Sequence, residues 1–235
     1  MDAADLARRP ARRMRSKPPR ELPKTKRHMQ FSRQFERALV YATRIHSGQF
    51  RKKTRIPYVA HILGVAAIAL EYGANETEAI AALLHDAVED CGGAKRLRDI
   101  RRRFGEKVAR IVEGCTDTDQ TPKPPWLERK KAYMAHVPSA SVSTKLVSAS
   151  DKLHNVRATL MTYRREGEKV WSRFKGGKQG TLWYYRALVK AFGDTKSPKL
   201  SGLVQEFDRT LSELERLSNK GAQVTQPPPH LIGED

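Results

Sequence analysis

Three features of this 235-residue sequence predict an all-α fold. Apolar residues recur every three or four positions along most of the chain, which is the periodicity of an amphipathic helix. Sustained alternation of apolar and polar residues, the pattern of a half-buried strand, is found nowhere in the chain. Glycine, proline and asparagine stand between the periodic segments, where helices are expected to begin and end. We therefore expect a helical bundle.

The first half of the chain predicts five helices. One begins near Phe31 and ends near Gly48, and a second passes through His61 and closes at Gly73. Asn75 is a favourable N-cap for a third helix, which we expect to continue to about Asp90 before the Gly92-Gly93 pair. The fourth helix is expected to end at position 105, and the fifth is expected to begin at about position 107.

The second half begins with a Pro-rich stretch at 117–126, which we expect to be a surface-exposed or functional loop. The periodic segments that follow predict helices at about 127–136, 141–164 and 181–193. A last amphipathic pattern covers 200–217. We expect its apolar side to pack on the domain or on a second copy of the chain, which would make a homo-oligomer.

Positive charge is concentrated in the N-terminal tail of the chain. The formal net charge is +19, and residues 1–28 carry ten Lys or Arg against three acids. With four prolines and little apolar periodicity, this tail is expected to be disordered. No apolar run is long enough for a membrane helix. Two cysteines fit reduced thiols, so we expect a cytoplasmic protein. The organisation we predict is a disordered basic tail at 1–28, a catalytic domain at 29–195, a helix at 196–220 and a disordered Pro-rich tail at 221–235.

Histidines and acids at three separated places point to a metal site. The third predicted helix is apolar up to His85-Asp86, which Glu89-Asp90 follow one turn later. Buried unpaired charge is costly, whereas a cation bound to imidazole and carboxylate offsets that cost. We expect His61 and Asp151 to complete the ligand set by tertiary contact. Two imidazoles and two carboxylates leave positions open for water and substrate, as a catalytic site requires.

The mixed nitrogen and oxygen ligand set favours Mn²⁺, ahead of Fe²⁺, Zn²⁺ and Mg²⁺. The working hypothesis from the residues is therefore a metal-dependent hydrolase. A basic body suits a polyanionic substrate, although charge alone does not separate nucleotides from nucleic acid.

The order and spacing of these motifs resemble one family. The sequence is similar to the HD-domain phosphohydrolases, and within them to the hydrolase domain of the RelA/SpoT homologues and the small alarmone hydrolases. The resemblance covers about residues 34–190. The motifs that carry it are His46-Ser-Gly-Gln-Phe-Arg51-Lys52, Pro57-Tyr58-Val-Ala-His61, Ala81-Ala-Leu-Leu-His85-Asp86-Ala-Val-Glu89-Asp90 and Ser150-Asp151-Lys152-Leu-His154-Asn155-Val-Arg157.

The resemblance implies an activity and a role for each site residue. The implied reaction is Mn²⁺-dependent removal of the 3′-pyrophosphate from ppGpp or pppGpp. The implied metal ligands are His61, His85, Asp86 and Asp151. Glu89 and Asp90 match the acidic pair that orients and deprotonates the attacking water. The implied substrate-binding residues are Arg51, Lys52, Asn155 and Arg157. His154 is expected to point away from the site.

Two alternatives stay open at this point. The first is another HD hydrolase, acting on a ppApp-type alarmone, NADPH or a nucleoside monophosphate, since the motifs do not identify the base. The second is a basic nucleic-acid-binding protein with a relict metal site. It would use the cationic segment 95–103, for which a solvated helix face is the simpler explanation. Because every expected ligand is present, we do not expect nucleic acid as the partner.

Overall fold

Helices form the architecture of the computed structural model, which describes residues 30–120 and 122–219. The α-helices are α1 (Arg33–Ile45), α2 (Val59–Glu71), α3 (Glu76–Leu84), α4 (Ala87–Asp90), α5 (Gly93–Phe104), α6 (Glu106–Cys115), α7 (Trp126–His136), α8 (Val142–Glu166), α9 (Gly177–Gly193) and α10 (Pro198–Asn219). Two 3₁₀ segments, η1 (Val137–Ser139) and η2 (Gly167–Arg173), flank α8. The described ranges contain no strand beyond an isolated bridge between Phe50 and Pro57. The all-α prediction is confirmed. The predicted tails at 1–28 and 221–235 lie outside the described residues.

Most of the predicted helix boundaries agree with the structure, and local capping explains several of them. The side chains of Ser32 and Ser141 each accept a hydrogen bond from a backbone N–H in the first turn of the helix that follows. Asn75 forms a capping box with Glu78, which fixes the start of α3. Gly105, with φ of +88°, separates α5 from α6.

The prediction of one continuous helix over 75–90 is wrong. Helix α3 ends at Leu84, a turn holds His85 and Asp86, and α4 is a separate four-residue helix. The His85 ring donates through Nδ1 to the Ala82 carbonyl (2.8 Å), which a continuing helix would use for the Asp86 amide. The break therefore falls at the predicted ligands His85 and Asp86, so Glu89 and Asp90 do not follow them on one continuous helix.

The region after α8 also differs from the prediction. The segment η2 was not expected, and α9 begins at Gly177 rather than near 181. A side chain does not fit at position 176, just before α9, because a Cβ on Gly176 would lie 2.7 Å from the Trp126 ring. The Trp126 ring thus sits directly on the backbone that precedes α9.

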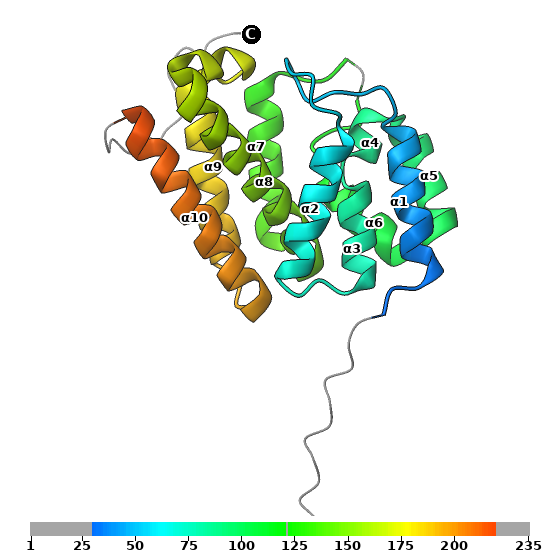
Figure 1. The fold of residues 1–235 in the computed structure, drawn as a ribbon. Coiled ribbons are helices and arrows are strands. Elements are labelled where there is room, and N and C mark those ends of the chain that lie inside the picture. The colour runs from blue at the N-terminus through cyan, green and yellow to red at the C-terminus, as the bar shows by residue number, and fades with distance from the viewer. Residues whose placement is uncertain (1–29, 121, 220–235) are drawn as a thin grey trace, which may run out of the picture. The chain divides into compact units, whose positions relative to one another are not determined.

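Helix α3 lies at the centre of the fold, with every residue from Glu78 to Leu84 buried. It contacts α1, α2, α6 and α8. Figure 1 shows α2, α3 and α8 in the middle of the unit that begins at Phe31, with α1 and α5 on one side and α9 and α10 on the other. The two central helices α2 and α8 are also the helices that carry His61 and Asp151.

The last helix closes the core from within the same chain. The apolar face of α10 packs on α8 and α9, and its core positions are fully buried: Leu200, Leu203, Phe207, Leu211 and Leu214. The apolar side of α10 is therefore occupied within the chain, and a contact between copies made through this helix would use its exposed side.

We expect Phe207→Ala to lower the free energy of unfolding by about 3–5 kcal/mol, because the change leaves a cavity under α10. Gln205→Ala, on the exposed side of the same helix, is expected to change it by less than about 0.5 kcal/mol. Urea denaturation followed by circular dichroism measures both. Equal stability of the two variants would show that α10 is not an integral part of the folded unit.

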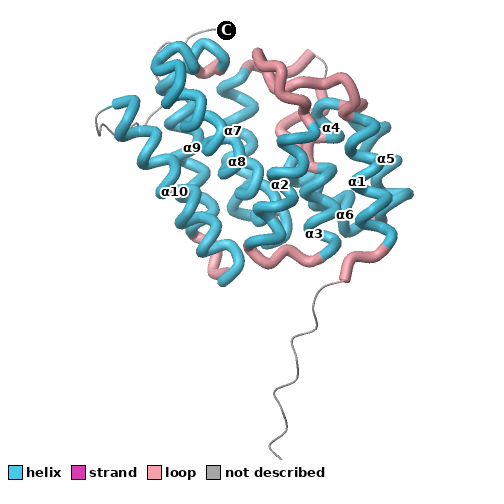
Figure 2. The backbone as a smooth tube through the Cα atoms, in the orientation of Figure 1, coloured by secondary structure: helices cyan, strands magenta, loops and turns pink. Residues whose placement is uncertain are grey.

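Loops gather at one end of the helices. Figure 2 shows the segments that precede α2 and follow α6 at the end where α4 lies. The N-terminal turn of α2, with His61, faces the same end. Among the helices of residues 30–120 and 122–219, none has the length and apolar character that crossing a bilayer requires.

Candidate active site

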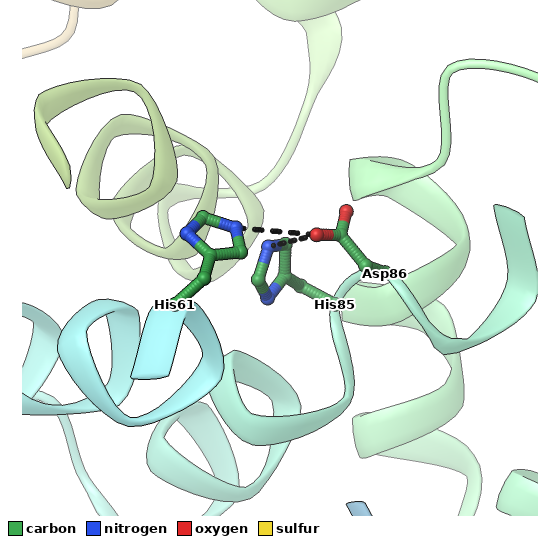
Figure 3. Close-up of side chains that lie close together, drawn as sticks. All are labelled: His61, His85 and Asp86. Carbon is green, nitrogen blue, oxygen red and sulfur yellow. Dashed lines mark ion pairs between the residues drawn. The ribbon is translucent and has the colours of Figure 1, made fainter. Parts of the chain in front are cut away.

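The structure brings the four predicted metal ligands together from two helices, α2 and α8, and the turn between α3 and α4. His61 Nε2 lies 3.2 Å from Asp86 Oδ2 and 3.3 Å from Asp151 Oδ1. His85 Nε2 lies 2.9 Å and 3.7 Å from the same two oxygens. Figure 3 shows both imidazoles directed at the Asp86 carboxylate. The donor atoms of His61, His85 and Asp86 all lie within 4.8 Å of one another, a spacing that can hold one ion.

The cluster is buried and strongly attracts positive charge. Burial raises the pKa of Asp86, but the charge of His85 and the close approach of both imidazoles outweigh it and hold that pKa well below its usual range. Burial lowers the pKa of His85, yet Asp86 and Asp151 hold it well above its usual range. Both shifts have one cause: two carboxylates that share a small volume with two imidazoles favour a cation in that volume.

The orientation of His85 fits metal binding. A carbonyl only accepts, so the contact with Ala82 places a ring proton on Nδ1 and directs Nε2, the nitrogen that could bind a cation in place of a proton, at the carboxylates. Among the buried polar atoms of the described residues, His85 Nε2 has no hydrogen-bond partner of good geometry. A divalent cation bound between these groups would satisfy that atom.

Hydrogen bonds from neighbouring side chains fix both carboxylates. Tyr58 donates to Asp86 Oδ2 (2.6 Å), and burial together with the charge of Asp86 raises the pKa of its hydroxyl, so it remains a donor. Lys152 Nζ contacts Asp151 Oδ2 (2.5 Å), and Asn155 Nδ2 donates to Asp151 Oδ1 (2.6 Å). Neither Tyr58 nor Lys152 was predicted as a site residue, although both belong to the motifs that contain the ligands.

The predicted acidic pair lies on α4, next to the cluster. Glu89 Oε1 pairs with Lys123 Nζ (2.8 Å), and Asp90 Oδ1 lies 3.7 Å from the same nitrogen. Partial burial and the charges of Asp86 and Glu89 raise the pKa of Asp90 to about 6, against the effect of Lys123. A carboxylate with a pKa near neutrality is suited to general base catalysis. Lys123 was missed because it comes from the Pro-rich loop, where no helical spacing links it to α4.

Arg51 is joined to the cluster rather than free beside it. Its Nη2 donates to Asn155 Oδ1 (2.8 Å), and its Nη1 lies 3.0 Å from His154 Nδ1 and 3.2 Å from His61 Nδ1. Asn155 therefore bridges Arg51 and the ligand Asp151. The guanidinium keeps further N–H groups that a phosphate could use.

The expectation that His154 points away from the site is wrong. His154 Nδ1 lies 2.9 Å from His61 Nδ1, and the ring centroids are 4.8 Å apart. Burial, with His61 and Arg51 nearby, lowers the pKa of His154 to about 4, so the ring is neutral. The signal was present in the sequence, because a residue three positions after Asp151 shares its face of the helix.

The two remaining predicted substrate residues lie on the wall of an adjoining cavity. Lys52 stands on the loop before α2, where partial burial and the neighbouring Lys175 and Lys53 lower its pKa. Arg157, on α8, pairs with Glu206 of α10 (3.1 Å). Both residues line the same cavity as His61.

This cavity has a volume of about 1110 Å³ and begins at His61. Among the described residues that line it, Glu89 is the only acid, whereas eleven are basic: Arg51, Lys52, Lys53, Arg55, Lys123, Arg129, Lys130, Arg157, Arg165, Arg173 and Lys175. The volume is slightly above the usual range for small-molecule sites. A polyanion of nucleotide size suits this volume and this charge.

Comparison with known proteins agrees with this geometry. The HD domain family matches residues 38–182. Guanosine-3′,5′-bis(diphosphate) 3′-pyrophosphohydrolases of Xenopus tropicalis and Homo sapiens are 42% identical over 120 residues and 41% identical over 121 residues. A solved structure, described as a metazoan orthologue of SpoT that hydrolyses ppGpp and plays a role in starvation responses, is similar with a TM-score of 0.61 at 26% identity. That match covers 82% of this chain and 99% of the other.

The sequence matches and the family match cover different fractions of the chain. Each of the two sequence matches covers 50% of this chain and 64% of the relative, so the chain spans less than two thirds of the length of those relatives. The family match is longer, covers more than half of the chain and includes all four clustered ligands. The resemblance to RelA/SpoT-type hydrolases is thereby confirmed, and the chain belongs to the HD-domain family.

Proposed function

We propose that this protein is a metal-dependent phosphohydrolase that converts guanosine 3′,5′-bis(diphosphate) and water to GDP and pyrophosphate, with pppGpp as a second substrate. The observation that carries the proposal is the position of the cluster. Two imidazoles and two carboxylates converge, and one of these residues, His61, also lines a basic cavity large enough for a nucleotide with two phosphate chains. The names of the sequence relatives support the same reaction.

We assign the binding of the metal ion to the four clustered residues. His61, His85, Asp86 and Asp151 would hold the cation, for which we propose Mn²⁺ on the basis of the mixed ligand set. Such a cation supplies a nucleophilic hydroxide at neutral pH and neutralises phosphate charge.

Glu89 and Asp90 would orient the attacking water and take its proton. Arg51 and Lys52 would bind the phosphates of the substrate, Arg51 through paired N–H groups and Lys52 as a point charge. Asn155 would hold Arg51 and Asp151 in register. Arg157 would meet the part of the substrate farther from the cation.

A substrate panel with metal add-back tests the proposal. The protein is stripped with a chelator and offered ppGpp, pppGpp, ppApp, NADPH and nucleoside monophosphates, each with Mn²⁺, Mg²⁺ or Zn²⁺. We expect pyrophosphate release from ppGpp, highest with Mn²⁺ and absent without metal. Release of inorganic phosphate from NADPH alone, or turnover that persists after chelation, would contradict the assignment.

The structure offers less support for a nucleic-acid-binding function. Within the cationic segment 95–103, Arg96, Arg102 and Arg103 contact Asp99, and Arg101 pairs with Glu106. Part of that charge is therefore already compensated. A cytoplasmic location remains our proposal, and the two free cysteines suit a reducing compartment.

A further inference from the structure

We propose that His154 is a positioning residue for the ligand His61: its Nδ1 accepts the proton of His61 Nδ1, which leaves His61 Nε2 free to bind the cation, and Gly64 provides the space that this contact needs. The inference rests on the proposed function, because it presupposes that the cluster binds a cation. It assigns a role to two residues that the proposed mechanism leaves unused.

Three nitrogens meet behind His61, on the side away from the carboxylates. His61 Nδ1 and His154 Nδ1 are 2.9 Å apart, and Arg51 Nη1 lies 3.2 Å and 3.0 Å from them, respectively. Two ring nitrogens at 2.9 Å need a proton between them, because two facing lone pairs would repel. One imidazole therefore donates and the other accepts.

The chemistry of the cluster decides which ring donates. A neutral imidazole carries one proton, so a proton on His61 Nδ1 leaves a lone pair on Nε2. That nitrogen faces Asp86 and Asp151, where a metal ligand must have its lone pair. Hence His61 donates and His154 accepts. The guanidinium of Arg51 only donates, so its shorter contact, to His154, agrees with an acceptor at His154 Nδ1.

This arrangement repeats the logic seen at His85. There the Ala82 carbonyl takes the Nδ1 proton and directs Nε2 at the cluster. Histidines that bind metals usually donate their second nitrogen to such an acceptor, which fixes the tautomer and the ring orientation. His154 serves His61 as the carbonyl of Ala82 serves His85.

Gly64 is the complement of His154 on the facing helix. It lies three residues after His61 on α2, and a Cβ at this position would be 2.3 Å from both Cδ2 and Nε2 of His154. No real Cβ approaches an atom so closely, so any larger residue at position 64 must displace the imidazole. Gly64 is a costly residue in the middle of a helix, and this contact accounts for its presence.

The test measures Mn²⁺ binding without substrate, by electron paramagnetic resonance of the free ion. We expect His154→Leu to weaken Mn²⁺ binding by about 10- to 100-fold. His154→Asn should recover most of the affinity, since its Oδ1 can accept at nearly the position of the lost Nδ1. Gly64→Ala should weaken binding in the same direction, and the double variant Gly64→Ala/His154→Leu should bind no more weakly than His154→Leu alone.

Leu63→Ala is the matched control, because Leu63 is exposed on the same helix and does not line the cavity. It should bind Mn²⁺ like the wild type. Melting curves exclude unfolding, and Gly64→Ala in particular should favour the helix itself.

Wild-type affinity in His154→Leu, or a His154→Asn variant that binds no better than His154→Leu, would overturn the positioning role. Purely additive losses in the double variant would overturn the link to Gly64. A wild-type protein that does not bind Mn²⁺ would instead contradict the metal site and the proposed function.

Discussion

Asp86→Asn should abolish Mn²⁺-dependent release of pyrophosphate from ppGpp while leaving the fold intact. Asp86 Oδ2 faces both imidazoles, and the substitution removes the charge that favours a cation between them. Metal-ion catalysis supplies several kcal/mol, so we expect a loss on the order of 10³-fold or more in kcat/KM. A continuous pyrophosphate assay measures the loss, and Mn²⁺ titration should show weakened binding.

Asparagine retains the volume and can still accept from Tyr58, so stability should change little. Asp194→Asn is the control, because Asp194 is exposed at the end of α9. It should keep wild-type turnover. If Asp86→Asn hydrolyses ppGpp at the wild-type rate with unchanged metal affinity, the assigned ligand set is wrong.

Glu89→Gln and Asp90→Asn should each lower kcat by about 10²- to 10⁴-fold, the usual contribution of a positioned acid or base. Unlike Asp86, neither residue belongs to the four-ligand cluster, so Mn²⁺ binding should remain close to that of the wild type. Single-turnover kinetics at saturating substrate separates the chemical step from binding. A loss of metal affinity equal to the loss of rate would place the pair among the ligands instead.

A substitution of Lys123 provides an independent test of the role of Glu89 and Asp90. It binds Glu89 and approaches Asp90 from the loop that the sequence marked as surface-exposed or functional. Lys123→Met should therefore alter kcat in the wild type but change it much less when Glu89 is already Gln, because contacting residues are not additive. Full additivity would show that Lys123 acts elsewhere in the cavity.

Local patterns predicted the helices well but failed where a side chain overrides the backbone pattern. The apolar run into His85 looks continuous in the sequence, but α3 ends at Leu84, where the His85 ring takes the Ala82 carbonyl that the next helical turn would use. The four ligands could be predicted because burying imidazole and carboxylate groups in an apolar setting costs free energy unless a partner such as a cation offsets it. Their convergence from separate helices depends on tertiary packing, which no local pattern encodes.

Three of the residues that sequence reasoning missed share one property. His154, Lys152 and Tyr58 act through a ligand rather than as one, so their residue types alone carry little information. His154 could have been found from its spacing to Asp151 on one helix face. Its partner Gly64 could not, because the close approach of α2 to α8 becomes visible only in three dimensions.

The basic lining of the cavity has a consequence for turnover. Eleven cationic side chains raise the local concentration of a polyanion and speed its capture at low ionic strength, an effect that salt screens. Pyrophosphate, a product of the proposed reaction, is itself a polyanion and would meet the same field on its way out. The same positive field that speeds capture of the substrate would therefore slow the release of pyrophosphate. Pyrophosphate would then compete with substrate for the cavity. Added salt would slow capture but speed product release, so turnover would respond to ionic strength through both steps.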